Sequence, residues 1–234
     1  MQATAGGNLT FLRDNLLYPK DDAERNVPTD AERNVPTDAE RNVPALTEAA
    51  LPDFFKALDP IVGRVPAGSN GLIYTPWIWG ERAPVDDRTL RAGLYNLSLH
   101  NTRADILRAF LEGIALNTRW LLAPVEKFLE RKLESIHIVG GGGQSDVWCQ
   151  IFTDGLNVEI RQVKDPIQAN ARGAAFIAAA GLGEITFADV PALVKIQRTY
   201  AHNGQNRGLY DERFCVFLGI YKQMRGIYRQ LNTL

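Results

Sequence analysis

The chain has 234 residues, of which 45% are hydrophobic, and this is enough to bury one substantial core in a single domain. Its 26 Lys and Arg side chains are balanced by 27 Asp and Glu side chains, so no overall field favours nucleic acid or a membrane surface as a partner. The start of the chain lacks a basic segment followed by an apolar one, and no run approaches about 18 apolar residues. We therefore expect neither secretion nor a membrane span, and place the protein in the cytoplasm.

The N-terminal part of the chain combines two predicted helices, Ala5–Leu17 and Leu46–Ala57, with a repeat. Between them, D-A-E-R-N-V-P occurs three times from Asp22 to Pro44. A period of eight residues is too short for a helical solenoid, and each copy ends at a proline that stops a helix. Because few apolar groups offset the entropy of ordering, we expect a flexible or irregular surface insertion.

A buried strand is predicted at Leu72–Thr75, within L-I-Y-T-P-W-I-W-G-E-R-A-P, and a polar G-E-R-A-P loop follows it. We interpret Trp77 and Trp79 as core or interface packing, and Glu81 with Arg82 as an ordinary surface ion pair.

A long helix is predicted at Thr102–Arg131, after a loop that begins near Gly93. Apolar residues recur in this helix at helical spacing, so most of it is expected to face the core; examples are Ile106, Leu107, Phe110, Leu111 and Ile114.

Four consecutive glycines follow a strand predicted at Ile136–Val139 and precede a helix predicted at Ser145–Leu156. Without side chains at the turn, a ligand can lie directly against the backbone, and the first free N–H groups of the helix point toward it. This pattern is typical of a nucleotide site. The alternative is a tight strand-to-helix turn in which Ser145 only caps the helix.

Common nucleotide motifs do not fit this turn. A dinucleotide fingerprint starting at Gly140 or Gly141 would need a third glycine at Ser145 or Asp146, and the chain has no G-K-[ST] ending of a Walker A motif. Asp146 suits the dipole of the helix but would repel a triphosphate. We therefore expect the neutral adenosine end of ATP here.

The rest of the chain continues the alternation of strands and helices. A strand is predicted at Glu159–Val163, a helix at Gln168–Gly181 and an amphipathic helix at Leu209–Asn232. The small side chains of Ala169–Gly183 favour a helix lying very close to a sheet. The pattern predicts an α/β domain with parallel neighbouring strands. Cys149 and Cys215 form no metal or redox motif, and we expect two buried free thiols.

Six motifs in chain order carry a resemblance to a known family. They are a G-L-x-x-x-P strand, G-E-R-A-P, G-L-Y followed by H-N-T-R, R-A-F-L-E-G, G-G-G-x-x-S-x-x-W, and G-A-A-F-I-A-A-A-G-L-G. With them the chain resembles the C-terminal domain of an ATP-dependent sugar kinase of the FGGY group, the xylulokinase-like carbohydrate kinases. The turn departs from the commonest family spelling at Gly143 and Gln144, where alanine and lysine are frequent.

The resemblance implies a ribonuclease-H-like domain of the actin, hexokinase and Hsp70 type, truncated at its N-terminal hairpin and spanning residues 1–234. It implies phosphoryl transfer from ATP, with Mg²⁺, to a sugar or polyol hydroxyl. The catalytic aspartate is expected in an N-terminal kinase domain that this chain lacks, so we expect the chain alone to be inactive. The alternative is a non-catalytic remnant or a partner-binding module that keeps the fold.

The same resemblance assigns the expected nucleotide contacts. Gly141, Gly142, Gly143 and Ser145 are expected at the adenosine, with Gln144 at the pocket rim. The loop around His100 and Thr102 is expected at the nucleotide or at the domain interface. Gly173, Ala174 and Ala175 are expected near the purine pocket or in helix-to-sheet packing.

Overall fold

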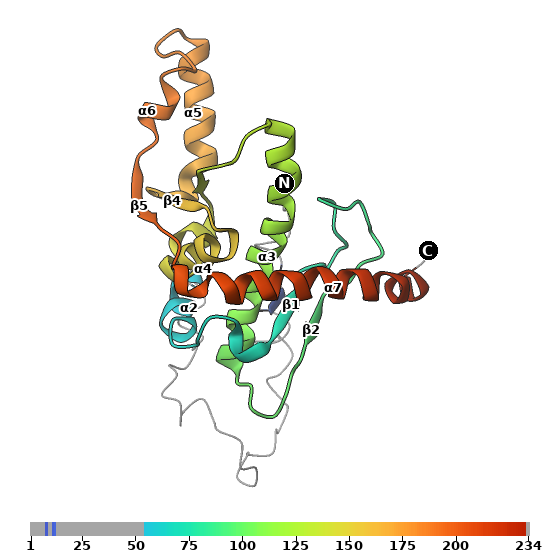
Figure 1. The fold of residues 1–234 in the computed structure, drawn as a ribbon. Helices are drawn as coiled ribbons and strands as arrows, with labels where there is room; N and C mark the ends of the chain where they lie inside the picture. The colour runs from blue at the N-terminus through green and yellow to red at the C-terminus, as the bar shows by residue number, and fades with distance from the viewer. Residues whose placement is uncertain (1–7, 9–10, 13–53, 233–234) are drawn as a thin grey trace, which may run out of the picture.

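The computed structural model of the protein describes residues 54–232 together with Asn8, Phe11 and Leu12. The elements, drawn in Figure 1, are α2 (Phe54–Val62), β1 (Ile73–Thr75), β2 (Gly93–Tyr95), α3 (Arg103–Leu129), β3 (Ser135–Ile138), α4 (Asp146–Leu156), β4 (Glu159–Val163), α5 (Ala169–Gly181), α6 (Val190–Leu193), β5 (Ile196–Tyr200) and α7 (Arg207–Asn232). Short 3-10 turns lie at Ser69–Gly71, Gly141–Gln144, Pro166–Gln168 and Gly204–Asn206.

Three N-terminal predictions lie largely outside the described residues. Of the helix predicted at Ala5–Leu17, the described residues Asn8 and Phe11 are α-helical. The repeat at Asp22–Pro44 and most of the helix predicted at Leu46–Ala57 are not described. The described helix α2 continues to Val62, beyond the predicted end, because Leu58, Ile61 and Val62 are all buried in the core.

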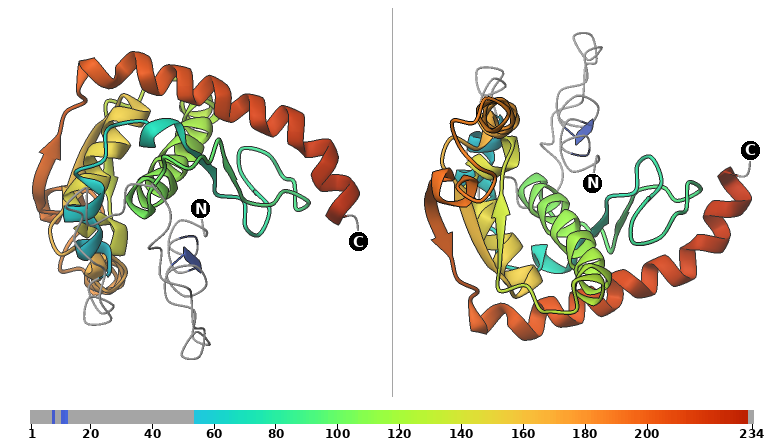
Figure 2. Two further views of the ribbon diagram at one scale, coloured as in Figure 1. Left: turned by 90° about the horizontal axis from the view of Figure 1, so that it is seen from below. Right: turned by 90° about the horizontal axis from the view of Figure 1, so that it is seen from above.

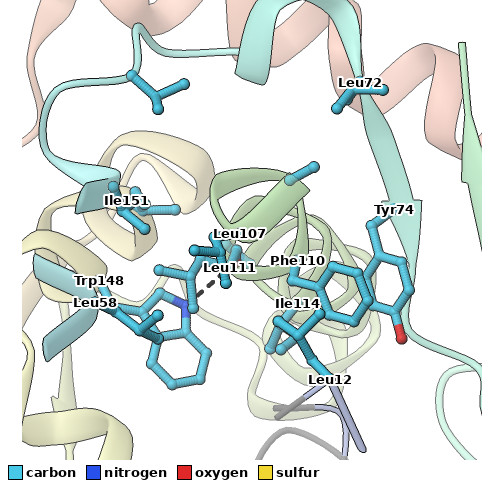
Figure 3. Packing of buried hydrophobic residues seen from close by; sticks show 14 of the residues in the cluster. Leu12, Leu58, Leu72, Tyr74, Leu107, Phe110, Leu111, Ile114, Trp148 and Ile151 are labelled. Carbon is cyan, nitrogen blue, oxygen red and sulfur yellow. Dashed lines mark hydrogen bonds between the residues drawn. The ribbon is translucent and has the colours of Figure 1, made fainter. Parts of the chain in front are cut away.

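The long helix α3 lies at the centre of the molecule and begins where the sequence predicted. Thr102 is its N-cap, and Asp105 completes a capping box by accepting a hydrogen bond of 2.6 Å from the Thr102 backbone N–H. Buried residues of α2, α3, α4 and β1 form the main core. Figure 3 shows Tyr74 of β1 stacked on Phe110 of α3, with ring centroids 3.6 Å apart, and Trp148 of α4 donating a hydrogen bond to the Leu111 carbonyl.

Gly113 lets α3 lie against the backbone of β1. A Cβ atom at this position would lie 2.2 Å from the carbonyl oxygen of Tyr74, a distance that no side chain tolerates. The glycine of the R-A-F-L-E-G motif is therefore explained by packing.

A buried carboxylate, Glu112, joins three parts of the chain beside this contact. It accepts hydrogen bonds from the Gly68 N–H (3.0 Å), the Ser69 hydroxyl (2.7 Å) and the Tyr210 hydroxyl (2.8 Å). It also forms an ion pair of 2.7 Å with Arg108 Nε, one turn earlier in α3. Arg108 donates in turn to the Val62 carbonyl at 3.2 Å. The network connects the turn before β1 and the start of α7 to the middle of α3.

The strands form two small sheets. β1 and β2 pair antiparallel, β3 and β4 pair parallel, and β5 joins β4 antiparallel. The predicted parallel arrangement is thus confirmed for β3 and β4 and wrong for the other two pairs. β2 and β5 were not predicted, since β2 has only three residues and β5 exposes all of its residues except Tyr200.

The alanine-rich helix α5 does not pack as predicted. None of its residues is buried, and a Cβ atom added at Gly173 would meet nothing within 4 Å. Figure 1 shows α5 and α6 standing out from the remaining helices. The prediction that Gly173, Ala174 and Ala175 lie against a sheet is wrong for the described residues, because small side chains permit close packing but do not supply a partner.

The last helix, α7, crosses α3 and continues along the loop between β1 and β2 (Figure 2). The rings of Phe217 and Tyr221 of α7 pack edge-on against Trp77, which is fully buried. At its far end Asn232 donates a hydrogen bond of 3.1 Å to the Thr89 carbonyl. None of the described helices is both long and apolar enough to cross a membrane.

Three interpretations of single residues need correction. Trp79 is not packed, since 85% of it is exposed. Glu81 is buried and forms no ion pair with Arg82 among the described residues; its carboxylate accepts hydrogen bonds from the backbone N–H of Arg82 and from Asn117 Nδ2. Cys149 is buried as expected, but Cys215 is exposed on α7.

Candidate nucleotide-binding site

The glycine turn lies where the carboxyl ends of two parallel strands meet. Gly140 follows β3 with a φ of 85°, and residues Gly141–Gln144 form a 3-10 turn that leads into α4. The Gly140 N–H donates a hydrogen bond of 2.8 Å to the Pro166 carbonyl in the loop after β4. The two loops that follow the parallel strands are therefore joined, at the edge of an α/β sheet where ligands commonly bind.

The glycines of the turn have different surroundings. A Cβ atom at Gly142 would lie 2.3 Å from the ring of Trp148, and Gly143 is buried against Ile138 and Pro166. A Cβ atom at Gly140 would meet nothing within 4 Å. One side of the turn is thus closed by the indole of Trp148, and the side at Gly140 remains open.

Ser145 caps α4. It is buried, its hydroxyl accepts a hydrogen bond of 3.0 Å from the Trp148 N–H, and it donates a short hydrogen bond to Asp59 of α2. Asp59 also accepts a hydrogen bond of 2.9 Å from the Asp146 N–H. Burial raises the pKa of Asp59, although these hydrogen bonds act against that shift. Ser145 therefore caps α4, as the capping alternative predicted, and its hydroxyl also ties α2 to α4.

Asp146, in the first turn of α4, is held by the neighbouring sheet. Its carboxylate accepts hydrogen bonds from the Tyr200 hydroxyl (2.7 Å) and from Arg198 (3.2 Å) on β5. Burial, followed by the hydrogen bond to Asp146, raises the pKa of Tyr200. The pKa of Cys149, one turn further along α4, is raised to about 12, first by burial and then by the charges of Asp146 and Asp59.

A cavity of about 290 Å³ opens beside the turn. Its lining combines side-chain amides with one carboxylate and apolar surface: Gln144, Gln162, Asp165, Pro166, Ile167, Gln168 and Gln197. The lining contains no Lys or Arg. Amide groups both donate and accept hydrogen bonds, so they can pair with the edge of a neutral base, whereas the Asp165 carboxylate would repel phosphate. The lining fits the adenosine end of ATP better than its phosphates.

The predicted contact residues are only partly brought together. Gln144 lines the cavity, as expected for a residue at the pocket rim, and Gly141–Gly143 form the adjoining turn. Ser145 faces the interior. His100 is exposed in the loop before α3, Thr102 caps that helix, and neither lines the cavity.

Neither the loop after β4 nor Gln197 of β5 was predicted to lie at the site. The loop after β4 could have been predicted. Asp165 and Pro166 follow a strand that was expected to run parallel to β3, and the carboxyl ends of parallel strands lie at the same edge of a sheet. Gln197 lies on an antiparallel strand with little hydrophobic pattern, so no sequence signal pointed to it.

No group of three or more His, Cys, Asp or Glu side chains in the described part of the chain is placed to hold a metal ion.

Comparison with known proteins identifies this arrangement. The model of the FGGY family of carbohydrate kinases, C-terminal domain, matches residues 2–182. A xylulose kinase from Staphylococcus epidermidis is 34% identical over 172 residues, which cover 71% of this chain and 34% of that protein. A gluconokinase from Bacillus subtilis is 25% identical and covers 76% of this chain and 35% of that protein. The chain thus spans about a third of the length of these relatives.

Solved structures of sugar kinases share the fold. A gluconate kinase from Lactobacillus acidophilus superposes with a TM-score of 0.66 at 26% identity, covering 75% of this chain and 36% of that one. A xylulose kinase from Rhodospirillum rubrum gives a TM-score of 0.64 at 29% identity, covering 79% and 39%. The fold is the ribonuclease-H-like α/β fold of sugar kinases. The chain belongs to the FGGY family of carbohydrate kinases and matches their C-terminal domain.

Proposed function

We propose that this chain is the nucleotide-binding half of an ATP-dependent sugar kinase. The proposal rests on one observation: an open glycine turn at the ends of two parallel strands adjoins a cavity of about 290 Å³ lined by neutral amides, one carboxylate and apolar surface. Gln144 and Gln168 would bind the base, Ile167 would lie against its face, and Asp165 would accept hydrogen bonds from ribose hydroxyls. ATP supplies the transferred phosphoryl group.

Residues 183–234 are proposed to belong to the same domain, although the family model ends at residue 182. β5 pairs with β4 in the sheet beside the site, and α7 packs on Trp77 and hydrogen-bonds to Glu112. We propose one domain over residues 1–234.

Phosphoryl transfer itself is proposed to need a second domain. The matched part covers 34% of the xylulose kinase from Staphylococcus epidermidis. We propose that the base that takes the proton from a sugar or polyol hydroxyl lies outside this part. A coupled assay with ATP, Mg²⁺ and xylulose should show no sugar-dependent turnover by the chain alone. Sugar-dependent turnover above the ATPase background would contradict the proposal that phosphoryl transfer needs a second domain.

Calorimetry tests nucleotide binding directly. Adenosine, ADP and ATP should bind with dissociation constants within about tenfold of one another, because no cation lines the cavity to favour phosphates. Ile167→Asp should weaken ADP binding about tenfold or more by placing a second carboxylate in the cavity. The matched control is Ile177→Asp on α5, because Ile177 is similarly exposed (64% against 58%) but does not line the cavity. No heat with millimolar ADP, or equal loss in both variants, would reject the site.

A further inference from the structure

One buried amide, that of Gln162, connects the glycine turn to the sheet. Gln162 lies on β4 and lines the cavity, although only 1% of it is exposed. Its Nε2 group donates a hydrogen bond of 2.8 Å to the carbonyl of Gly143, which is itself buried. A buried carbonyl without a partner is costly, so this bond fixes the end of the turn. The turn is thereby held at two points, since the Gly140 N–H is bonded to the loop after β4.

The neighbours of Gln162 favour one orientation of its amide. Nε2 also lies 3.3 Å from a carboxylate oxygen of Asp146, and Oε1 lies 3.3 Å from the Tyr200 hydroxyl. If the amide were turned over, its oxygen would face the Gly143 carbonyl and the Asp146 carboxylate, which can only accept hydrogen bonds. Gln162 therefore presents its donor, and not its acceptor, to the turn.

Strand β5 supports this orientation. The Tyr200 hydroxyl donates a hydrogen bond of 2.7 Å to Asp146, and Arg198 pairs with the same carboxylate at 3.2 Å. The guanidinium of Arg198 lies 4.9 Å from the centre of the Tyr200 ring, within the range of a cation–π contact. Both β5 residues lie beyond residue 182, where the match to the family model ends. The support of the glycine turn thus includes a strand that the family model does not cover.

On the basis of the nucleotide site proposed above, we propose that Gln162 and Tyr200 are positioning residues for adenosine binding. Gln162 holds the Gly143 end of the turn in the geometry that the ligand meets. Tyr200 holds the Gln162 amide and the Asp146 carboxylate in place. A turn that is fixed before the ligand arrives loses less conformational entropy on binding, so affinity should fall when this support is removed.

A titratable group in place of the amide separates positioning from packing. Gln162→Glu keeps the size of the side chain. Its carboxylate would repel the Gly143 carbonyl and Asp146, whereas its protonated form can donate a hydrogen bond to that carbonyl, as the amide does. Burial and the charge of Asp146 should raise the pKa of the new carboxyl group above its ordinary value of about 4.3. The other charged groups near position 162 are Arg198 on β5, which acts against this shift, and Asp165 in the cavity lining, which adds to it.

Calorimetry with adenosine, a neutral probe, measures the effect. The wild type should bind equally well at about pH 5 and about pH 8, because no histidine lines the cavity. Gln162→Glu should bind at least about tenfold more weakly than the wild type at about pH 8 and recover to within about threefold at about pH 5. The matched control, Gln197→Glu, places the same group in the lining at a side chain that bonds to no other described residue. Its affinity should hardly change with pH.

A second variant, Tyr200→Phe, keeps the ring and removes only the hydroxyl. It should weaken adenosine binding about threefold or more at both pH values, with circular dichroism to confirm that it is folded. If Gln162→Glu does not fold, Tyr200→Phe decides alone.

The outcomes distinguish this proposal from the nucleotide site itself. No heat with the wild type would reject the nucleotide site, and the positioning role with it. Binding by the wild type, with both folded variants within about twofold of it at about pH 8, would reject the positioning role alone. A loss in Gln162→Glu that is the same at both pH values would also reject it, because packing and not the hydrogen bond to Gly143 would then be responsible.

Discussion

Removal of the Glu112 carboxylate is expected to be the most damaging change to a single buried polar group in the described core. Glu112 is 4% exposed and has four partners: Arg108, the Gly68 N–H, and the hydroxyls of Ser69 and Tyr210. Glu112→Ala would leave the guanidinium of Arg108 buried without its anion and three donors without their acceptor. Breaking a buried ion pair on one side costs about 3–5 kcal/mol of the free energy of unfolding.

The lower end of that range applies here, about 3 kcal/mol. Arg108 would keep its hydrogen bonds to the Val62 carbonyl (3.2 Å) and to the Tyr210 hydroxyl (3.4 Å), and the donors at Gly68 and Ser69 can relax toward water. For a domain of this size the loss corresponds to a fall in Tm of about 6–12 °C.

Urea unfolding followed by circular dichroism measures the loss. The control is Glu212→Ala on the exposed side of α7, where the ion pair with Arg213 is loose (3.8 Å) and the change should stay below about 1 kcal/mol. The double variant Arg108→Met and Glu112→Leu should be more stable than Glu112→Ala, since it leaves no buried charge unpaired. If Glu112→Ala unfolds within about 1 kcal/mol of the wild type, the carboxylate is not the centre of the network, and the reasoning is refuted.

Three further outcomes are expected. Gly113→Ala should destabilise the fold by about 1–3 kcal/mol or more, because the added Cβ would collide with β1. Gly173→Ala on α5 should be neutral or stabilising by up to about 1 kcal/mol, because a Cβ there meets nothing. Equal Tm values for the two variants would contradict the packing described. A thiol reagent at neutral pH should label Cys215 rapidly and Cys149 only on unfolding, since Cys149 is buried with a raised pKa; mass spectrometry of the labelled peptides decides this. Asp59 has a raised pKa in the folded state, so its contribution to stability is fully present below its unfolded pKa of 3.8 and is lost as the pH rises through the folded pKa. Over that pH range the free energy of unfolding of the wild type should fall relative to that of Asp59→Asn. If unfolding experiments give a difference between the two proteins that does not change with pH, this prediction is wrong.

Periodic segments of the sequence predicted their structure well. β4 and the body of α3 agree with the expected ranges. In α3 the reason is a clear apolar pattern together with a capping residue, Thr102. The pattern also predicted Ser145 as the N-cap of α4. Sequence signals were sufficient to predict these elements because helix capping involves residues that are close in sequence, and burial of one helix face produces a regular spacing of apolar residues.

Contacts between distant segments were not accessible in the same way. The sequence does not show that Trp77 is enclosed by α7 while Trp79, two residues later, is exposed. Nor does it show that Glu81 bonds to Asn117, 36 residues further along the chain. At the candidate site the glycine turn and Gln144 were found from the motif. The other amides that line the cavity come from β4, β5 and the loop between β4 and α5, and their convergence depends on strand pairing.

The hydrogen-bond network at Glu112 also affects how the protein folds during synthesis. Tyr210 is 98 positions downstream of the carboxylate to which it bonds, and Phe217 and Tyr221 of the same helix, α7, pack against Trp77. On the ribosome, α3 is synthesised long before α7. The Glu112 carboxylate therefore lacks its partner Tyr210, and the indole of Trp77 lacks its cover, until α7 has left the exit tunnel. This part of the tertiary structure is thus completed only after α7 has been synthesised, and until then its apolar surface stays accessible.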